Sequence, residues 1–198
     1  MKIKCDVGFN RSLLNTVRAA SFSSLPVVRP IGFMVAGTSN VVSLPDTVLE
    51  DMTKFIANVS KGEFIYTGNE ALIVCNASFT GELKLSELLA GTAIKAVEDF
   101  TILHATETIS VKVLFRFDRG CYTLEQNRDF LEKHSASNCV VINSRHCPIK
   151  SFNVLDANTS AAKDTFEITI DTISGVDETE VWNESIDAII STLSHLKR

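Results

Sequence analysis

His146 and Cys147 are adjacent, and no other possible nucleophile in the sequence stands out beside a possible base. A cysteine attacks as its thiolate, which an imidazole within hydrogen-bond reach can generate. Neighbouring residues on an extended chain point to opposite faces, however, and this argues against a productive pair. A stand-alone thiol hydrolase using Cys147 and His146 therefore remains an alternative and not the leading interpretation.

Other residues that could bind metals or cofactors do not fall into recognisable patterns. No histidine pair has the i, i+4 spacing of a helical metal clamp, and no Cys-x-x-Cys occurs. The sequence also lacks a glycine-rich phosphate loop, a dinucleotide fingerprint and an Asp-x-Asp pair. We expect no catalytic, cofactor-binding or metal residue in this chain. The residues considered are His104, His134, His146 and His195, and Cys5, Cys75, Cys121, Cys139 and Cys147.

The composition describes an ordinary globular protein that carries net negative charge. The chain has 198 residues, of which 19 are Lys or Arg and 24 are Asp or Glu, so its formal charge is −5. This balance argues against direct DNA contact, because affinity for nucleic acid depends on Lys and Arg that displace counterions. The polar N-terminus lacks a signal-peptide core, and no apolar run is long enough to span a membrane. A cytoplasmic protein without membrane contact is expected.

Periodicity predicts helices near both ends and sheet in the middle. Apolar residues keep a helical period over 9–22, and Pro26 and Pro30 then impose extended backbone. Further helices are predicted over 46–59 and 124–134, a β-hairpin from 64–66 and 71–75, and strands over 82–85, 100–117 and 140–142. Alternation over 166–170 precedes a final helix with a capping-box-like start at Asp177 and Glu180. The pattern indicates an α+β fold.

The final helix is apolar over a wide stripe. Such a stripe on a terminal helix suggests a helix-mediated dimer, while packing on the protein's own sheet is an equally open alternative. The stripe consists of Val181, Trp182, Ser185, Ile186, Ile189, Ile190, Leu193 and Leu196.

Five segments, read in chain order, resemble the alpha subunit of bacterial and plastid multisubunit RNA polymerase. The first segment matches the family's first helix at Gly8, Phe9, Leu13, Asn15, Arg18, Ser23, Ser24 and Pro26. The matched segments are GFNRSLLNTVRAASFSSLP (8–26), VLEDMTKFIANVSKG (48–62), RGCYTLEQN (119–127), CPIKSFNVLDANT (147–159) and residues 164–196. Each match is weak alone, but five collinear matches across nearly the whole chain are specific.

The resemblance implies a non-catalytic scaffold in a nucleotidyltransferase complex that performs transcription. A homodimer of such subunits would assemble the β and β′ subunits, and β′ would hold the catalytic Mg²⁺. The implied architecture has two domains: a discontinuous sheet-plus-helices dimerisation domain, residues 1–26 plus 149–198, and an inserted β-rich domain, residues 27–148. The implied location is cytoplasmic or the stroma of a plastid-like organelle, with no small-molecule substrate.

The resemblance also implies two sets of contact residues. The first would form the dimer interface and its core: Phe9, Leu13, Leu14, Val17, Ile186, Ile189, Ile190 and Leu193. The second would contact the large subunits: Asn15, Arg18, Phe22 and Lys150. Without the resemblance, Asn15 and Arg18 would be read as a solvated helix face.

The sequence departs from the family pattern in three places and ends early. Leu14 replaces a helix glycine, Ala19 replaces an arginine, and Cys121 replaces a glycine, so contacts there must differ. The sequence stops at Arg198, directly after the last helix. We therefore expect no C-terminal DNA-binding domain and no promoter contact through one. A heterodimerising counterpart of archaeal or nuclear type is the alternative within the family.

Overall fold

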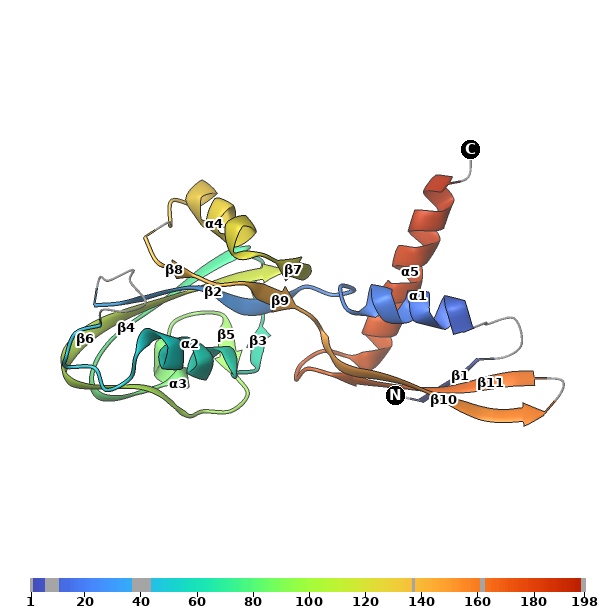
Figure 1. Cartoon of the computed structure of the whole chain (residues 1–198), viewed down its shortest axis with the longest axis horizontal. Coiled ribbons are helices and arrows are strands. Elements are labelled where there is room, and N and C mark those ends of the chain that lie inside the picture. The colour runs from blue at the N-terminus through green and yellow to red at the C-terminus, as the bar shows by residue number, and fades with distance from the viewer. Residues whose placement is uncertain (1, 6–10, 37–43, 137, 161–162, 197–198) are drawn as a thin grey trace. The chain divides into compact units, whose positions relative to one another are not determined.

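The computed structural model describes residues 2–5, 11–36, 44–136, 138–160 and 163–196, and it divides the chain into two compact units. The terminal unit comprises residues 1–26 and 147–198, and the central unit comprises residues 27–146. Five helices and exclusively antiparallel strand pairs occur within the described ranges (Figure 1), so the predicted α+β class is confirmed.

The terminal unit packs two helices on a three-stranded sheet. Its strands are β1 (Lys2–Cys5), β10 (Ile149–Ser160) and β11 (Lys163–Thr172), in the order β1-β11-β10. Its helices are α1 (Arg11–Ser21) and α5 (Glu178–Leu196). Asp177 accepts a hydrogen bond at Oδ1 from the Thr179 amide at 2.9 Å, as the predicted helix start requires. The buried side chains are Leu14, Val17, Leu25, Cys147, Ile149, Phe152, Phe166, Ile168, Ile170 and Val181.

The central unit is built around a four-stranded sheet with helices on both faces. Its strands are β2 (Val27–Val35), β4 (Leu72–Lys84), β6 (Thr101–Asp118) and β8 (Val140–Val141), in the order β4-β6-β2-β8. The core of one face includes α2 (Met52–Ser60) and α3 (Leu85–Leu88), and that of the other includes Leu131 of α4 (Leu124–Lys133). Two small sheets pair β3 (Phe64–Tyr66) with β5 (Ile94–Ala96), and β7 (Gly120–Tyr122) with β9 (Ser144–His146).

The helix predicted over 46–59 begins only at Met52. Asp51 is its N-cap and accepts a hydrogen bond from the Lys54 amide at 2.7 Å. The preceding residues pair with β6 instead: the Leu49 amide donates to the His104 carbonyl, and the Thr106 amide donates to the Thr47 carbonyl. These tertiary hydrogen bonds override the helical periodicity of 46–51.

The predicted hairpin of 64–66 with 71–75 is wrong. β3 pairs with β5, whereas the strand that starts at Leu72 pairs with β6. The Thr67 amide donates to the Ala93 carbonyl, and this continues the β3 pairing away from β4. The strand predicted over 100–117 and the helix predicted over 124–134 are confirmed as β6 and α4.

Candidate subunit interface

The helices α1 and α5 pack against each other through small and apolar residues. Leu14 and Val17 of α1 and Val181 of α5 are fully buried in the core of the terminal unit. The hydroxyls of Ser21 and Ser185 lie 3.0 Å apart, and each also lies within hydrogen-bond distance of a carbonyl four residues earlier in its own helix. Because a hydroxyl has one hydrogen, one serine donates along its helix and the other donates across the contact. Both hydroxyls at this contact therefore find their hydrogen-bond partners within a single chain.

The C-terminal half of α5 leaves an apolar stripe uncovered. Ile186 and Ile189 are partly buried and pack on the core of the terminal unit, while Ile190 and Leu193 are each 57% exposed. These four residues recur every three or four positions and so share one side of the helix. The last turns of α5 extend beyond α1 (Figure 1). The stripe begins in the unit's own core and continues onto its surface.

The side of α1 that does not face the core of the terminal unit is polar. Asn15 and Arg18 are exposed, and so is Lys150 near the start of β10. Phe22, directly after α1, is partly buried and packs on the core of the terminal unit. Of the four predicted large-subunit contacts, three therefore present polar side chains at the surface, and Phe22 is partly covered by its own unit.

The eight predicted dimer residues fall into different environments. Leu14 and Val17 belong to the core of the single chain. Leu13, Ile186 and Ile189 are partly buried, and Ile190 and Leu193 are exposed. Phe9 lies outside the described residues.

In the central unit, the segment 119–127 ends in a buried asparagine that organises a hydrogen-bond network. Arg116 Nη1 donates to Asn127 Oδ1 at 3.2 Å, and Asn127 Nδ2 donates to Ser144 Oγ at 3.0 Å and to the Ile142 carbonyl at 2.8 Å. The Arg116 guanidinium also stacks 3.4 Å from the centroid of the Tyr122 ring. Sequence reasoning identified this segment only through the family resemblance and assigned no role to Asn127.

His146 completes this network in its neutral form. Its Nδ1 lies 2.8 Å from the Val27 carbonyl, which can only accept, so Nδ1 carries the hydrogen. Nε2 then accepts from Ser144 Oγ at 2.9 Å. The pKa of His146 is below its usual value, chiefly because burial penalises the charged ring, and the Arg116 charge acts in the same direction.

Arg116 is also held by a carboxylate. Its Nε and Nη2 donate to Asp118 Oδ2 at 2.9 and 2.5 Å. Burial raises the pKa of Asp118, but hydrogen bonds from the Arg119 amide and from Arg116 outweigh burial and leave that pKa below its usual value. The network thus combines a fixed arginine of β6 with a neutral histidine of β9, which is an arrangement suited to holding strands together.

The His146–Cys147 pair does not have the arrangement of a thiol catalyst. Both ring nitrogens of His146 are engaged by Ser144 and Val27. The Cys147 thiol is buried and donates to the Ile149 carbonyl, with 3.2 Å between Sγ and O. These hydrogen bonds are structural, and they do not favour the hydrolase alternative.

Within the described part of the chain, no three His, Cys, Asp or Glu side chains gather as a metal site would require. None of its helices combines the length and hydropathy needed to cross a membrane.

Comparison with curated proteins finds similarity to a DNA-directed RNA polymerase subunit alpha from Syntrophomonas wolfei subsp. wolfei (strain DSM 2245B / Goettingen). The two sequences are 24% identical over 160 residues, which cover 80% of this chain and 51% of that protein. The chain therefore spans about half the length of this curated relative. No protein-family model matches the chain.

Proposed function

We propose that this chain is a homodimeric scaffold subunit of a DNA-directed RNA polymerase, on which the β and β′ subunits assemble. The observation that carries the proposal is the uncovered apolar stripe of α5, in a unit built from both ends of the chain. The five collinear sequence matches and the similarity to an RNA polymerase alpha subunit support it. In this proposal, the terminal unit is the dimerisation domain and the central unit is the inserted domain.

The dimer would form by pairing the stripe of one protomer with that of its two-fold mate. A closed two-fold interface is self-complementary, so residues such as Ile190 and Leu193 would meet the same surface on the partner. Burying a Leu or Ile side chain fully contributes about 1.5–3 kcal/mol. Side chains that are already partly covered gain less, but each contribution is made twice in a symmetric dimer. Ile186 and Ile189 would link the interface to the core of each protomer.

The large subunits would dock on the polar side of α1. Arg18 offers a planar guanidinium that can bind carboxylates or backbone carbonyls through two hydrogen bonds at once. Asn15 lies beside it on the same exposed surface, and Lys150 adds a second positive charge from β10. The chain would contribute no catalytic residue, and the Mg²⁺ chemistry would belong to β′.

Charged substitutions on the stripe test the dimer. Ile190→Asp with Leu193→Asp should abolish self-association, because each buried, unpaired carboxylate costs several kcal/mol. Both positions are exposed in the single chain, so the variant should still fold with an unchanged far-UV circular dichroism spectrum. Sedimentation velocity is the measurement, with a dimer expected for the unaltered protein and a monomer for the variant.

Leu155→Asp is the matched control, because Leu155 is 60% exposed in the same unit but lies on β10. This control should remain a dimer. An unaltered protein that sediments as a monomer at micromolar concentration would contradict the homodimer and favour the heterodimerising alternative.

Purification of the native complex tests the scaffold role. A tagged copy of the chain, expressed in its own cells, should recover β and β′ with two copies of the chain per complex, as counted by native mass spectrometry. The variant with Ile190→Asp and Leu193→Asp should lose both large subunits, whereas Leu155→Asp should retain dimerisation. Recovery of the chain without β or β′ would refute the proposed function.

A further inference from the structure

β4 forms an open edge of the central sheet. It pairs with β6 on one side, and its register is continuous from Leu72↔Arg116 to Phe79↔Ile109. The Phe117 amide donates to the Ala71 carbonyl at 2.9 Å, so these two residues form a hydrogen-bonded pair. In an antiparallel ladder hydrogen-bonded and non-hydrogen-bonded pairs alternate. The amides and carbonyls of Leu72, Val74, Asn76 and Ser78 therefore point away from β6.

This edge has no partner within the part of the chain that the structure describes. Over residues 72–79 it also lacks the features that usually prevent edge strands from pairing, namely Lys, Pro and bulges. Residues 72–79 read LIVCNASF, without charge or proline, and the first irregularity of register comes after Phe79. An edge so regular is an available template for one more strand.

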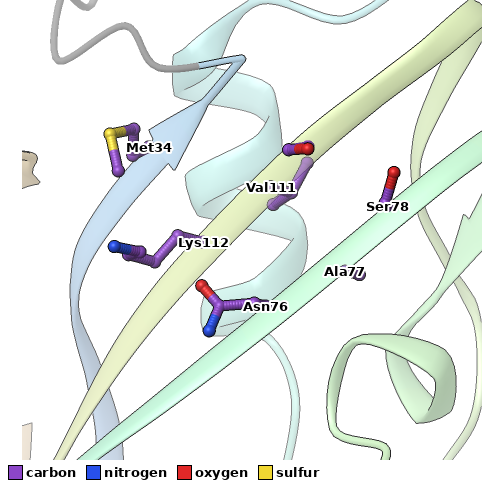
Figure 2. A pocket seen from close by; sticks show the side chains of 7 residues that line it. Met34, Asn76, Ala77, Ser78, Val111 and Lys112 are labelled. Carbon is purple, nitrogen blue, oxygen red and sulfur yellow. The ribbon is translucent and has the colours of Figure 1, made fainter.

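Open space adjoins β4 at two positions. A cavity of about 540 Å³ lies over β4, β6 and β2 and is lined by Asn76, Ala77 and Ser78 of β4, Lys112 of β6 and Met34 of β2, among others (Figure 2). A second cavity of about 570 Å³ adjoins Leu72, Ile73 and Val74, between the loop 68–70 and residues 91–93. A side chain of an added strand that reaches back over β4 would find room in the first cavity, and one beside residues 72–74 would find room in the second.

The charge at the first cavity indicates what kind of strand would fit. Lys112 lies opposite Asn76 on β6, one strand in from the edge, and its stem can span the ~4.8 Å between strands. It is the charged side chain among the residues that line this cavity, and no described carboxylate pairs with it. Near the second cavity, Val74 is 39% exposed and offers an apolar contact.

We propose that the β4 edge binds an extended segment of a partner polypeptide, which adds to the sheet as a fifth strand and directs an acidic side chain toward Lys112. A second copy of this chain fits less well, because antiparallel pairing of two β4 edges would place both Lys112 residues on one face. The site lies in the central unit and does not depend on the α5 stripe. Its failure would leave the scaffold proposal intact, and the reverse also holds.

A library of random ten-residue peptides displayed on phage, selected against the full-length chain, tests this binding. The enriched sequences should share an acidic residue flanked by alternating apolar or β-branched residues. Hydrogen exchange by NMR should show fast exchange of the Val74, Asn76 and Ser78 amides in the free chain. The synthetic form of the most enriched peptide should slow these amides at least about tenfold, since it would place them in a ladder.

Asn76→Pro is the deciding substitution. It removes an outward-pointing amide without removing a hydrogen bond to β6, and proline is tolerated at such edge positions. Peptide affinity should fall at least about tenfold, whereas Asn76→Ala, which keeps the amide, should bind as before. Lys112→Glu should reverse the preference from acidic to basic peptides.

Alternate N-methylation of the peptide provides a second test that leaves the protein unaltered, in case Asn76→Pro does not fold. Methylation of the amides on one edge of the bound strand should abolish binding, and methylation of those on the other edge should not. The proposal is overturned if no peptide is enriched, or if binding survives Asn76→Pro in the folded protein. It is also overturned if both methylated sets bind equally, or if the three amides become protected with rising chain concentration in the absence of peptide.

Discussion

At the scale of single residues, the neutral His146 ring makes stability depend on pH. Burial lowers its pKa in the folded chain relative to the unfolded value near 6.5. As pH falls below about 6.5, the unfolded chain therefore binds a proton that the folded chain does not yet bind. The free energy of unfolding should decrease from pH 7 to 5.5, by at most about 1.4 kcal/mol per pH unit for one proton. Urea unfolding at a series of pH values measures this slope.

His146→Gln removes the titrating ring and should leave the unfolding free energy lower but nearly constant over the same pH range.

The carboxylates whose pKa values are lowered affect stability only at more acidic pH. Glu50 accepts hydrogen bonds from His104 that outweigh its burial, and its contribution is lost only as pH falls below about 4.5. If the unfolding free energy of the His146→Gln variant still decreased from pH 7 to 5.5, the assignment of a neutral His146 ring would be contradicted.

Sequence reasoning could place His146 beside Cys147 but not inside the protein. Adjacency in the chain does not say which side chain is buried or where its hydrogen bonds go. The His146 ring hydrogen-bonds to the Val27 carbonyl and the Ser144 hydroxyl, and Val27 lies 119 positions away in sequence. Asn127 likewise depends on Arg116 of β6 and the Ile142 carbonyl, so its role follows from tertiary structure alone.

At the scale of elements, the predictions succeeded where local signals agreed with the fold. The helix predicted over 124–134 is such a case: the structure shows a capping box at its start, where Thr123 and Gln126 exchange hydrogen bonds between their side chains and amides. The start of α2 and the pairing of β3 depend on β6 and β5, which are distant in sequence. Apolar periodicity cannot report such competition, because it records which residues are apolar and not which backbone groups are already paired.

The N-cap of α2 distinguishes the observed helix start from the one that periodicity predicts. Asp51→Ala removes the acceptor for the Lys54 amide and should cost about 1 kcal/mol, within a usual range of 0.5–2. Asp46→Ala is the matched control, because Asp46 is exposed and lies where periodicity places the helix start. That variant should change stability by less than about 0.5 kcal/mol. Equal losses in urea unfolding would contradict the assigned cap.

At the scale of the whole molecule, the chain has separate cores for its two units. The apolar cluster around Ile168 draws only on residues 14–25 and 147–189, and the cluster around Phe55 draws only on residues of the central unit. Composition alone could not divide the chain in this way. The change from helix to strand at Pro26 marked one boundary, and the family resemblance supplied the idea that both ends belong together.

Separate cores should allow the two units to unfold in separate steps. Trp182, the single tryptophan, packs on the core of the terminal unit, so its fluorescence reports on that unit. Phe55→Ala creates a cavity in the central core that should cost about 3–5 kcal/mol. It should lower the midpoint of the main far-UV circular dichroism transition in urea and leave the fluorescence midpoint unchanged. Ile168 is fully buried in the other core, so Ile168→Ala should lower the fluorescence midpoint and leave the midpoint of the main circular dichroism transition unchanged. Coincident shifts of both midpoints in both variants would show that the units unfold as one.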